Sequence, residues 1–151
     1  MKILIMGLPG SGKTTLAKEL AYYFNIPHFN ADSLREAFDD WDFSPEGRER
    51  QFHRQADCIH HAGMGICDFV CPLNDFQRNF PCDFIIWMDT IKEGRFEDTN
   101  KLFQEPIEYD VRIEKWIDLN QLRNSLDGIN RGTKGIQHYL KEHFPRLVKL
   151  Q

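Results

Sequence analysis

The stretch Gly7-Leu8-Pro9-Gly10-Ser11-Gly12-Lys13-Thr14 decides the fold of this chain. It matches the phosphate-binding pattern G-x-x-x-x-G-K-[ST] at every fixed position. The apolar run KILIM at residues 2–6 predicts a strand before it, and Leu16, Leu20 and Tyr23 have helical spacing after it. A loop between strand and helix is expected to bind phosphates through its main-chain N–H groups and the positive end of the helix.

Two residues of the loop have distinct expected roles. Lys13 is expected to reach the β- and γ-phosphates, and the Thr14 hydroxyl to hold Mg²⁺. ATP and Mg²⁺ are therefore the predicted cofactors. The alternative is a glycine-rich turn from a strand into a helix with a chance lysine, which the coincidence of strand, motif and helix disfavours. The other residues expected to contact the nucleotide are Gly7, Pro9, Gly10, Ser11, Gly12 and Thr15.

The composition is that of one globular domain over residues 1–151. The chain is 41% hydrophobic and 28% charged, and no apolar run is long enough to span a membrane. It enters a strand at once, with no signal peptide, so a cytoplasmic protein is expected. A net charge of −4 gives no general attraction to nucleic acid and favours a small anionic ligand. We expect a monomer or a homodimer with no membrane partner.

Strand and helix signals alternate along the chain. The segment 45–62 predicts a long helix, with Ser44 as its cap and Gly63 as its stop. A last helix is expected from Thr133, and the final three residues are expected to form a tail. The alternation predicts a mostly parallel five-stranded sheet with helices on both faces. The predicted strands are 2–6, 27–30, 65–70, 83–88 and 109–113.

An acid and a base follow the second predicted strand. Asp32 and Arg35 share one face of a short predicted helix at 33–38, with Asp32 or Ser33 as its cap. Ligands of open α/β sheets lie outside the carboxyl ends of the strands, so both side chains are expected beside the phosphate loop. Because phosphoryl transfer needs an acid and cationic groups, Lys13, Asp32 and Arg35 are the catalytic candidates. The alternative is a capping acid and a solvated arginine.

Three arginines lie in the first turns of the predicted helix at 45–62. Positive charge is disfavoured at a helix N-terminus, so these side chains are not there to stabilise the helix dipole. Arg48 and Arg54 are candidates for holding an anionic substrate, and Arg50 is compatible with a solvated face.

Asp68 interrupts an otherwise apolar predicted strand. A buried acid is costly unless it is paired. Asp68 therefore either binds Mg²⁺, directly or through water, or has a structural partner. Both alternatives remain open from the sequence, and the candidate metal-binding residues are Thr14, Asp32 and Asp68.

The polar segment at residues 90–104 occupies the position of a phosphotransferase lid. A lid excludes water, so that ATP phosphorylates the substrate and not the solvent. Its cations are Lys92, Arg95 and Lys101, and Arg95 is the best candidate for contacting the nucleotide. The alternative is an ordinary charged loop.

Four motifs, spread over about residues 2–113, together resemble the adenylylsulfate kinase family of nucleotide kinases. The phosphate loop is followed by Asp32-Ser33-Leu34-Arg35, by FSPEGR at 43–48, by Phe69-Val70-Cys71-Pro72 and by Lys101-Leu102-Phe103. The resemblance implies the P-loop NTPase fold of a nucleotide kinase. It also implies transfer of the γ-phosphoryl of ATP to the 3′-hydroxyl of adenylylsulfate, a step of sulfate activation.

The resemblance also implies roles for individual residues. Arg35 and Arg48 would hold the phosphosulfate, and Asp32 would serve the 3′-hydroxyl or a metal-bound water. Phe43 and Phe103 would sandwich the adenine, since stacking on aromatic faces is worth about 1–3 kcal/mol per base. The remaining residues placed at the substrate by their motif positions are Gln51 and Lys101.

The chain also departs from this family. Cys71 stands where the family has serine, Gln51 where it has asparagine, and Gln104-Glu105 where it has Thr-Gly. Only ten residues lie between Thr90 and Lys101, about half of what the family has, which predicts a shortened lid and a more open site. The sequence therefore specifies the type of reaction better than it specifies the substrate.

Two other functions fit some of these features. Kinases of polynucleotide ends, or of hydroxymethylated bases in DNA, share the phosphate loop and the D-x-x-R motif, and an open site would admit a nucleic acid strand. The acidic charge argues against this function. A non-catalytic nucleotide-binding protein would keep Lys13 and Thr14, but it has no use for Asp32 and the arginines.

Overall fold

The computed structural model describes residues 1–115 and the backbone of 148–150. The helix expected from Thr133 lies outside the described residues. In chain order the elements are β1 (Lys2–Met6), α1 (Lys13–Phe24), β2 (His28–Asn30), α2 (Ala31–Ala37), α3 (Pro45–Ala62), β3 (Gly65–Phe69), α4 (Asn74–Asn79), β4 (Phe84–Met88), α5 (Glu97–Leu102), β5 (Val111–Ile113) and β6 (Val148–Leu150).

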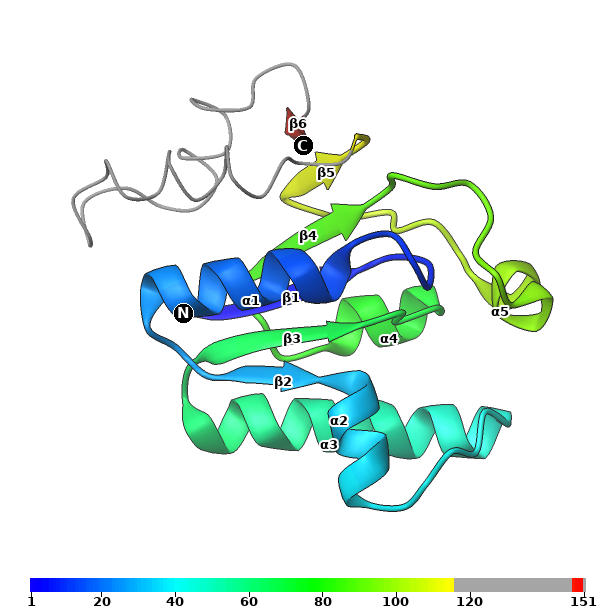
Figure 1. The fold of residues 1–151 in the computed structure, drawn as a ribbon, viewed down its shortest axis with the longest axis horizontal. Coiled ribbons are helices and arrows are strands. Elements are labelled where there is room, and N and C mark those ends of the chain that lie inside the picture. Colours follow the sequence, from blue (N-terminus) through cyan, green and yellow to red (C-terminus); the bar gives the residue numbers. More distant parts are fainter. Residues whose placement is uncertain (116–147, 151) are drawn as a thin grey trace.

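The sheet has the strand order β2-β3-β1-β4-β5-β6 (Figure 1). The first five of these strands are parallel, which confirms the predicted five-stranded parallel sheet. The expectation of a C-terminal tail is wrong for residues 149 and 150, because they belong to β6, which pairs antiparallel with β5, and Val111 lies opposite Leu150. An unpaired edge strand offers free main-chain groups, and β6 satisfies those of β5 on its outer side.

Both faces of the sheet are covered. Ile3 and Ile5 of β1 pack in the cluster that includes the apolar stripe of α1. Leu4 and Met6 pack in a second cluster on the opposite face, together with Phe52 of α3. Alternate residues of one strand therefore bury against different layers, which is why β1 reads as a continuous apolar run.

Local capping signals set the ends of α3 as predicted. The Ser44 hydroxyl accepts a hydrogen bond from Gly47 N at 3.2 Å, and Gly63 ends the helix with a φ of 72°. The cap of α2 differs from the prediction, because the Asn30 side chain accepts from Ser33 N at 3.0 Å. The Asp32 carboxylate is therefore not used as a cap.

The carboxyl ends of the parallel strands form the functional end of the molecule. Figure 1 shows the loop between β1 and α1 at this end, along with α2, the start of α3 and α5. The short helix α5 lies inside the polar segment at 90–104, for which the sequence predicted no helix. These elements supply the candidate site.

Candidate active site at the carboxyl ends of the strands

The loop between β1 and α1 depends on glycine at particular positions. A Cβ on Gly7 would lie 2.4 Å from the Met88 carbonyl oxygen, so glycine lets β1 approach the end of β4. Gly10 and Gly12 have φ angles of 87° and 96°, a region that other residues rarely adopt. No side chain caps α1, and its first turn contains no acid. Its N-terminal N–H groups and positive dipole end therefore suit an anion.

Lys13 lies within the curve of this loop. The side chain is buried, and its Nζ donates to the Leu8 carbonyl oxygen at 2.9 Å. Burial lowers the pKa of Lys13 to about 8, against the opposing effects of the Asp68 and Asp32 carboxylates. Both acids are thus close enough to Lys13 to act on its charge. The carboxyl-terminal part of β3 is joined directly to the phosphate-binding motif, since the Thr14 hydroxyl donates to Asp68 at 2.6 Å.

The depressed pKa of Lys13 predicts that nucleotide affinity depends on pH. The free protein loses the Lys13 proton above about pH 8. Because bound phosphates favour the charged amine, nucleotide binding should take up one proton there. We expect the association constant for Mg·ATP to fall with pH, approaching about tenfold per unit well above pH 8. Calorimetric titration between pH 7 and 9.5 measures this, and an unchanged affinity would contradict the assignment.

A polar cluster lies where the loop meets the sheet. Asp68 accepts a hydrogen bond from the Thr14 hydroxyl at 2.6 Å and from the Asn30 amide at 3.1 and 3.2 Å. Its other close partner is His28 Nε2, at 2.6 Å. Asp68 is 1% exposed, so these contacts replace its lost hydration. Asp68 therefore has structural partners and contacts the loop at the same time.

The sequence interpretation missed Asn30 and His28 as members of this cluster. Asn30 lies opposite Asp68 in the register of β2 and β3, and His28 is on the same short strand. The available signal was that the short strand β2 has two polar residues, His28 and Asn30, and that the strand paired with it contains an acid, Asp68. The signal is weak because it becomes visible only once the pairing of β2 with β3 is known.

The oxygen groups of this cluster fit Mg²⁺ better than a transition metal. Thr14 and Asp68 offer a hydroxyl and a carboxylate. No group of three His, Cys, Asp or Glu side chains arranged to hold a metal ion is found over residues 1–115. Proteins usually hold Mg²⁺ with one or two carboxylates together with substrate phosphates and water. Asp32 is exposed in the first turn of α2 and could supply a further carboxylate.

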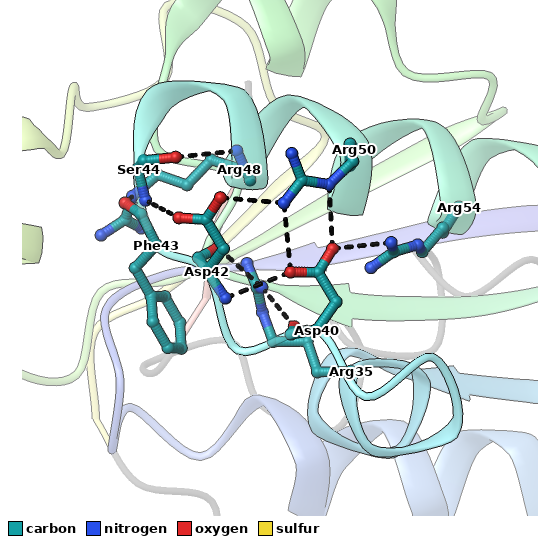
Figure 2. Close-up of polar contacts among 9 residues, drawn as sticks. Arg35, Asp40, Asp42, Phe43, Ser44, Arg48, Arg50 and Arg54 are labelled. Atoms are coloured by element: carbon teal, nitrogen blue, oxygen red, sulfur yellow. Dashed lines mark hydrogen bonds and ion pairs between the residues drawn. The ribbon is translucent and has the colours of Figure 1, made fainter.

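Two arginines converge on Phe43 (Figure 2). Arg35 is buried, and its guanidinium carbon lies 4.3 Å from the centre of the Phe43 ring. The guanidinium carbon of Arg48 lies 5.6 Å from the same centre, and Arg48 Nε donates to the Phe43 carbonyl oxygen at 2.9 Å. Burial lowers the pKa of Arg35, whereas the Asp40 and Asp32 carboxylates raise it. The cationic side of the site is therefore built around one aromatic ring.

The other two arginines of α3 face a different partner. Arg54 donates to Asp40 at 2.6 Å, and its guanidinium covers the Phe38 ring at 4.5 Å. Arg50 donates to Asp40 and Asp42, so it is neither simply solvated nor directed at a ligand. The sequence made Arg54 a candidate for holding an anionic substrate. In the structure its Nη2 is paired with Asp40, and its buried Nη1 has no hydrogen-bond partner among the described residues. Asp40 is 14 residues away, beyond the reach of local pattern reasoning.

Gln51 lies under the start of α2. The side chain is 4% exposed, and its amide donates to the Ala31 carbonyl oxygen at 3.1 Å. Its Oε1 has no hydrogen-bond partner within the part of the chain that the structure describes. Gln51 is thus adjacent to Asp32, where the family motif expects a substrate residue.

The segment at residues 89–103, here called the strap, is anchored on the phosphate loop. The Thr90 hydroxyl donates to the Ser11 carbonyl oxygen at 2.7 Å. A Cβ on Gly94 would lie 3.0 Å from the Pro9 carbonyl oxygen, so the strap passes close to the loop. The Asn100 side chain closes the strap through two hydrogen bonds of 2.8 Å with the main chain of Gly94. The segment predicted to be a shortened lid is therefore compact and held against the loop.

The cations of the strap differ in their partners. Lys92 and Arg112 both bind the buried Asp89 carboxylate. Lys101 pairs with Glu97 at 2.8 Å, one turn away on α5. Arg95 stacks over Phe96 at 5.1 Å and makes no ion pair in the described part of the strap. Arg95 is therefore the strap cation best able to contact a nucleotide.

Phe43 and Phe103 have different neighbours in the structure. Phe103 lines a small pocket of about 40 Å³ together with Leu8 and Ile91, whereas Phe43 lies against the two arginines. Phe103 is thus beside the phosphate loop. A purine held between the two rings remains a proposal.

Comparison with known proteins supports the fold. No family model matches the chain. The adenylate kinase of Pseudothermotoga lettingae is 53% identical over 38 residues, which are 24% of this chain and 18% of that protein. The chain therefore shares only a short segment with this relative. Over the described residues, no helix is long and apolar enough to cross a membrane.

Solved structures match over far more of the chain. The APS kinase of Mycobacterium tuberculosis, solved with AMPPNP and APS, has a TM-score of 0.67 and 17% identity, and the match covers 83% of this chain and 94% of that one. A gluconokinase from Sinorhizobium meliloti 1021 has a TM-score of 0.60 and 10% identity, and the match covers 83% of this chain and 88% of that one. A sugar kinase from Janibacter sp. HTCC2649 has a TM-score of 0.56 and 20% identity, and the match covers 83% of this chain and 88% of that one. The chain has the fold of P-loop kinases.

Proposed function

We propose that this protein is an ATP-dependent phosphotransferase that moves the γ-phosphoryl group of ATP to a hydroxyl. The carrying observation is that the phosphate loop, with Lys13 curled over it onto the Leu8 carbonyl oxygen at 2.9 Å, is joined to a buried acid, because the Thr14 hydroxyl donates to Asp68 at 2.6 Å. A nucleotide-binding protein without catalysis would need these residues but not the exposed Asp32, whose charge raises the pKa of Lys13. The similarity in fold to several kinases supports the same conclusion.

Each residue has a defined role in this proposal. The loop binds the triphosphate, and Lys13 balances the charge that develops on the leaving ADP. Asp32 accepts or orients the proton of the acceptor hydroxyl, whose oxygen then bonds to the γ-phosphorus as the bond to ADP breaks. Arg35 and Arg48 hold the acceptor in line, which lowers the entropic part of the barrier.

Mg²⁺ would be held by Thr14 and Asp68, with Asp32 as a further candidate, and would supply neutralisation of phosphate charge. The Asn30 and His28 contacts keep Asp68 directed at Thr14. Arg95 is the proposed strap contact to the nucleotide.

We propose adenylylsulfate as the acceptor. It combines an anionic group, which suits Arg35 and Arg48, with a purine that can stack on Phe43. The structural neighbour from M. tuberculosis was solved with APS, which supports this choice. Gln51, Lys101 and Phe103 complete the proposed acceptor site.

Replacing Phe43 or Phe103 with alanine should weaken binding of the acceptor more than binding of ATP. Loss of one stacking face costs about 1–3 kcal/mol, so the acceptor KM should rise by about fivefold or more. The KM for ATP should change less than twofold, because the phosphate loop is untouched. Steady-state kinetics with each substrate varied in turn measures both constants. An unchanged acceptor KM would remove the stacking proposal for that ring.

The proposed function is tested by following ADP release from Mg·ATP with two acceptors in separate assays, adenylylsulfate and a hydroxymethylated oligonucleotide. The proposal predicts ADP release that depends on adenylylsulfate. Release with the oligonucleotide alone would instead identify a nucleic acid kinase. Release with neither would favour a nucleotide-binding protein without catalysis.

A further inference from the structure

The Asp40 carboxylate, in the connection between α2 and α3, binds two arginines of α3. It accepts hydrogen bonds from Arg50 Nε at 3.0 Å, from Arg50 Nη2 at 3.2 Å and from Arg54 Nη2 at 2.6 Å. A fourth bond comes from Asp42 N at 3.2 Å. Only 13% of the side chain is exposed. The hydrogen bonds from the two arginines hold the pKa of Asp40 well below its usual range, so this carboxylate is charged throughout the neutral range.

Asp42 fastens the same connection to the first turn of α3. Its carboxylate accepts from Ser44 N at 2.9 Å and from Arg50 Nη2 at 2.8 Å. Gly47 permits the close approach, since a Cβ there would lie 2.2 Å from the Asp42 carbonyl oxygen. Residues 40–44 are thus held against α3 from two sides, as Figure 2 shows.

This fastened segment carries the contacts that orient Arg35. Arg35 Nη1 donates to the carbonyl oxygens of Asp40 and Asp42, at 2.9 and 3.0 Å. The same segment contains Phe43, whose ring lies against the Arg35 guanidinium. Asp40 does not touch Arg35 with its carboxylate. Its charge raises the pKa of Arg35 from a distance, and Asp40 places the Arg35 side chain through the main chain of residues 40–42.

We infer that Asp40 is a positioning residue for the acceptor site, which sets the placement of Arg35 and Phe43 through residues 40–44. The inference rests on the proposed function, because it treats Arg35 and Phe43 as acceptor contacts. It assigns a role to a residue that neither binds nucleotide nor touches the reacting groups. It also explains why Arg50 and Arg54 are paired within the protein and not directed at the acceptor anion.

The pairing has a second consequence for specificity. Without Asp40, Arg54 would lose its acidic partner and Arg50 would keep only Asp42, so positive charges one turn apart on α3 would be less fully balanced beside the site. Such charges would attract an anionic acceptor to a position away from Arg35. With Asp40 in place, the acceptor anion meets Arg35 and Arg48, the two guanidinium groups around Phe43.

The test is Asp40→Asn, which keeps the shape of the side chain but turns an amide nitrogen towards arginine donors. We expect the acceptor KM for adenylylsulfate, and its dissociation constant measured by calorimetry, to rise about tenfold or more, since small misplacements at a binding site are costly. The KM for ATP should stay within twofold of wild type. Asp40→Glu, which retains the charge, should recover part of the loss.

Asp39→Asn is the matched control. Asp39 is the adjacent acid, it makes no hydrogen bond or ion pair over residues 1–115 that involves an arginine of α3, and its φ of 49° suits asparagine. This variant has the same change in net charge and should retain wild-type affinity for adenylylsulfate. Equal losses in both variants would show a general charge effect and overturn the inference.

The inference and the proposed function can fail separately. If Asp40→Asn binds adenylylsulfate as wild type does, or loses affinity for ATP equally, Asp40 does not position the acceptor site. If wild type binds adenylylsulfate and Asp40→Asn binds it weakly, yet neither releases ADP, the kinase proposal fails and the positioning role stands. If wild type binds no adenylylsulfate, Asp40 has no such site to position, and the inference is wrong.

Discussion

Lys13→Ala is expected to reduce turnover of Mg·ATP with adenylylsulfate to between about a hundredth and a thousandth of the wild-type rate. The Lys13 amine lies inside the loop and is 9% exposed, so solvent cannot replace its charge as ADP leaves. Loss of one such group from a shielded site typically costs about 10²–10³ in kcat. The measurement is the initial rate of ADP release at saturating substrates.

Lys18→Ala is the control for Lys13→Ala. Lys18 lies on α1 as well, but it is exposed and remote from the phosphate loop, so its loss should leave the rate unchanged. Lys13→Ala should also remain folded. Burial disfavours the charged form of the Lys13 amine, so the folded protein does not depend on this charge for its stability. A rate within tenfold of wild type for Lys13→Ala would contradict its assigned role.

Asp32→Asn is expected to remove most of the rate while sparing nucleotide binding. General acid–base groups contribute about 10²–10⁴ to a rate, so kcat should fall by at least about a hundredfold. Asp32 is exposed and does not cap α2, so the change should not destabilise the helix. The dissociation constant for Mg·ATP, measured by calorimetry, should stay within about threefold.

Glu36→Gln is the matched control for this acid. Glu36 is exposed on α2, one turn after Asp32, and faces neither Lys13 nor the phosphate loop through any described interaction. It should retain the wild-type rate. If Asp32→Asn kept the wild-type kcat, the proposed role of Asp32 would be wrong. If it instead lost affinity for Mg·ATP, the acid would belong to metal binding.

Sequence patterns predicted features whose determinants are local. The phosphate loop, the caps of α3 at Ser44 and Gly63, and the apolar strands all depend on a few neighbouring residues. Alternation of strands and helices was then enough to predict the parallel sheet, since short crossovers allow few other arrangements. This is why the structure confirms the fold class and the long helix.

Features that depend on distant partners were not predicted. Nothing near Arg54 in the sequence indicates that Asp40 would bind it, because the contact depends on how residues 38–44 turn back onto α3. The same holds for Asn30 and Asp68, which meet only through the pairing of β2 with β3. The strand β6 was missed because its partner β5 lies about 40 residues earlier and its own three residues carry no turn signal.

The central claim is that the glycine-rich loop binds triphosphate and that Asp32 and Arg35 face it across the acceptor site. The most direct measurement is a crystal structure with a non-hydrolysable ATP analogue, Mg²⁺ and adenylylsulfate. The account predicts the triphosphate along residues 7–14, the Asp32 carboxylate within hydrogen-bond distance of the acceptor hydroxyl, and the acceptor anion on Arg35 and Arg48. A triphosphate bound elsewhere, or Asp32 and Arg35 directed away from both ligands, would contradict it.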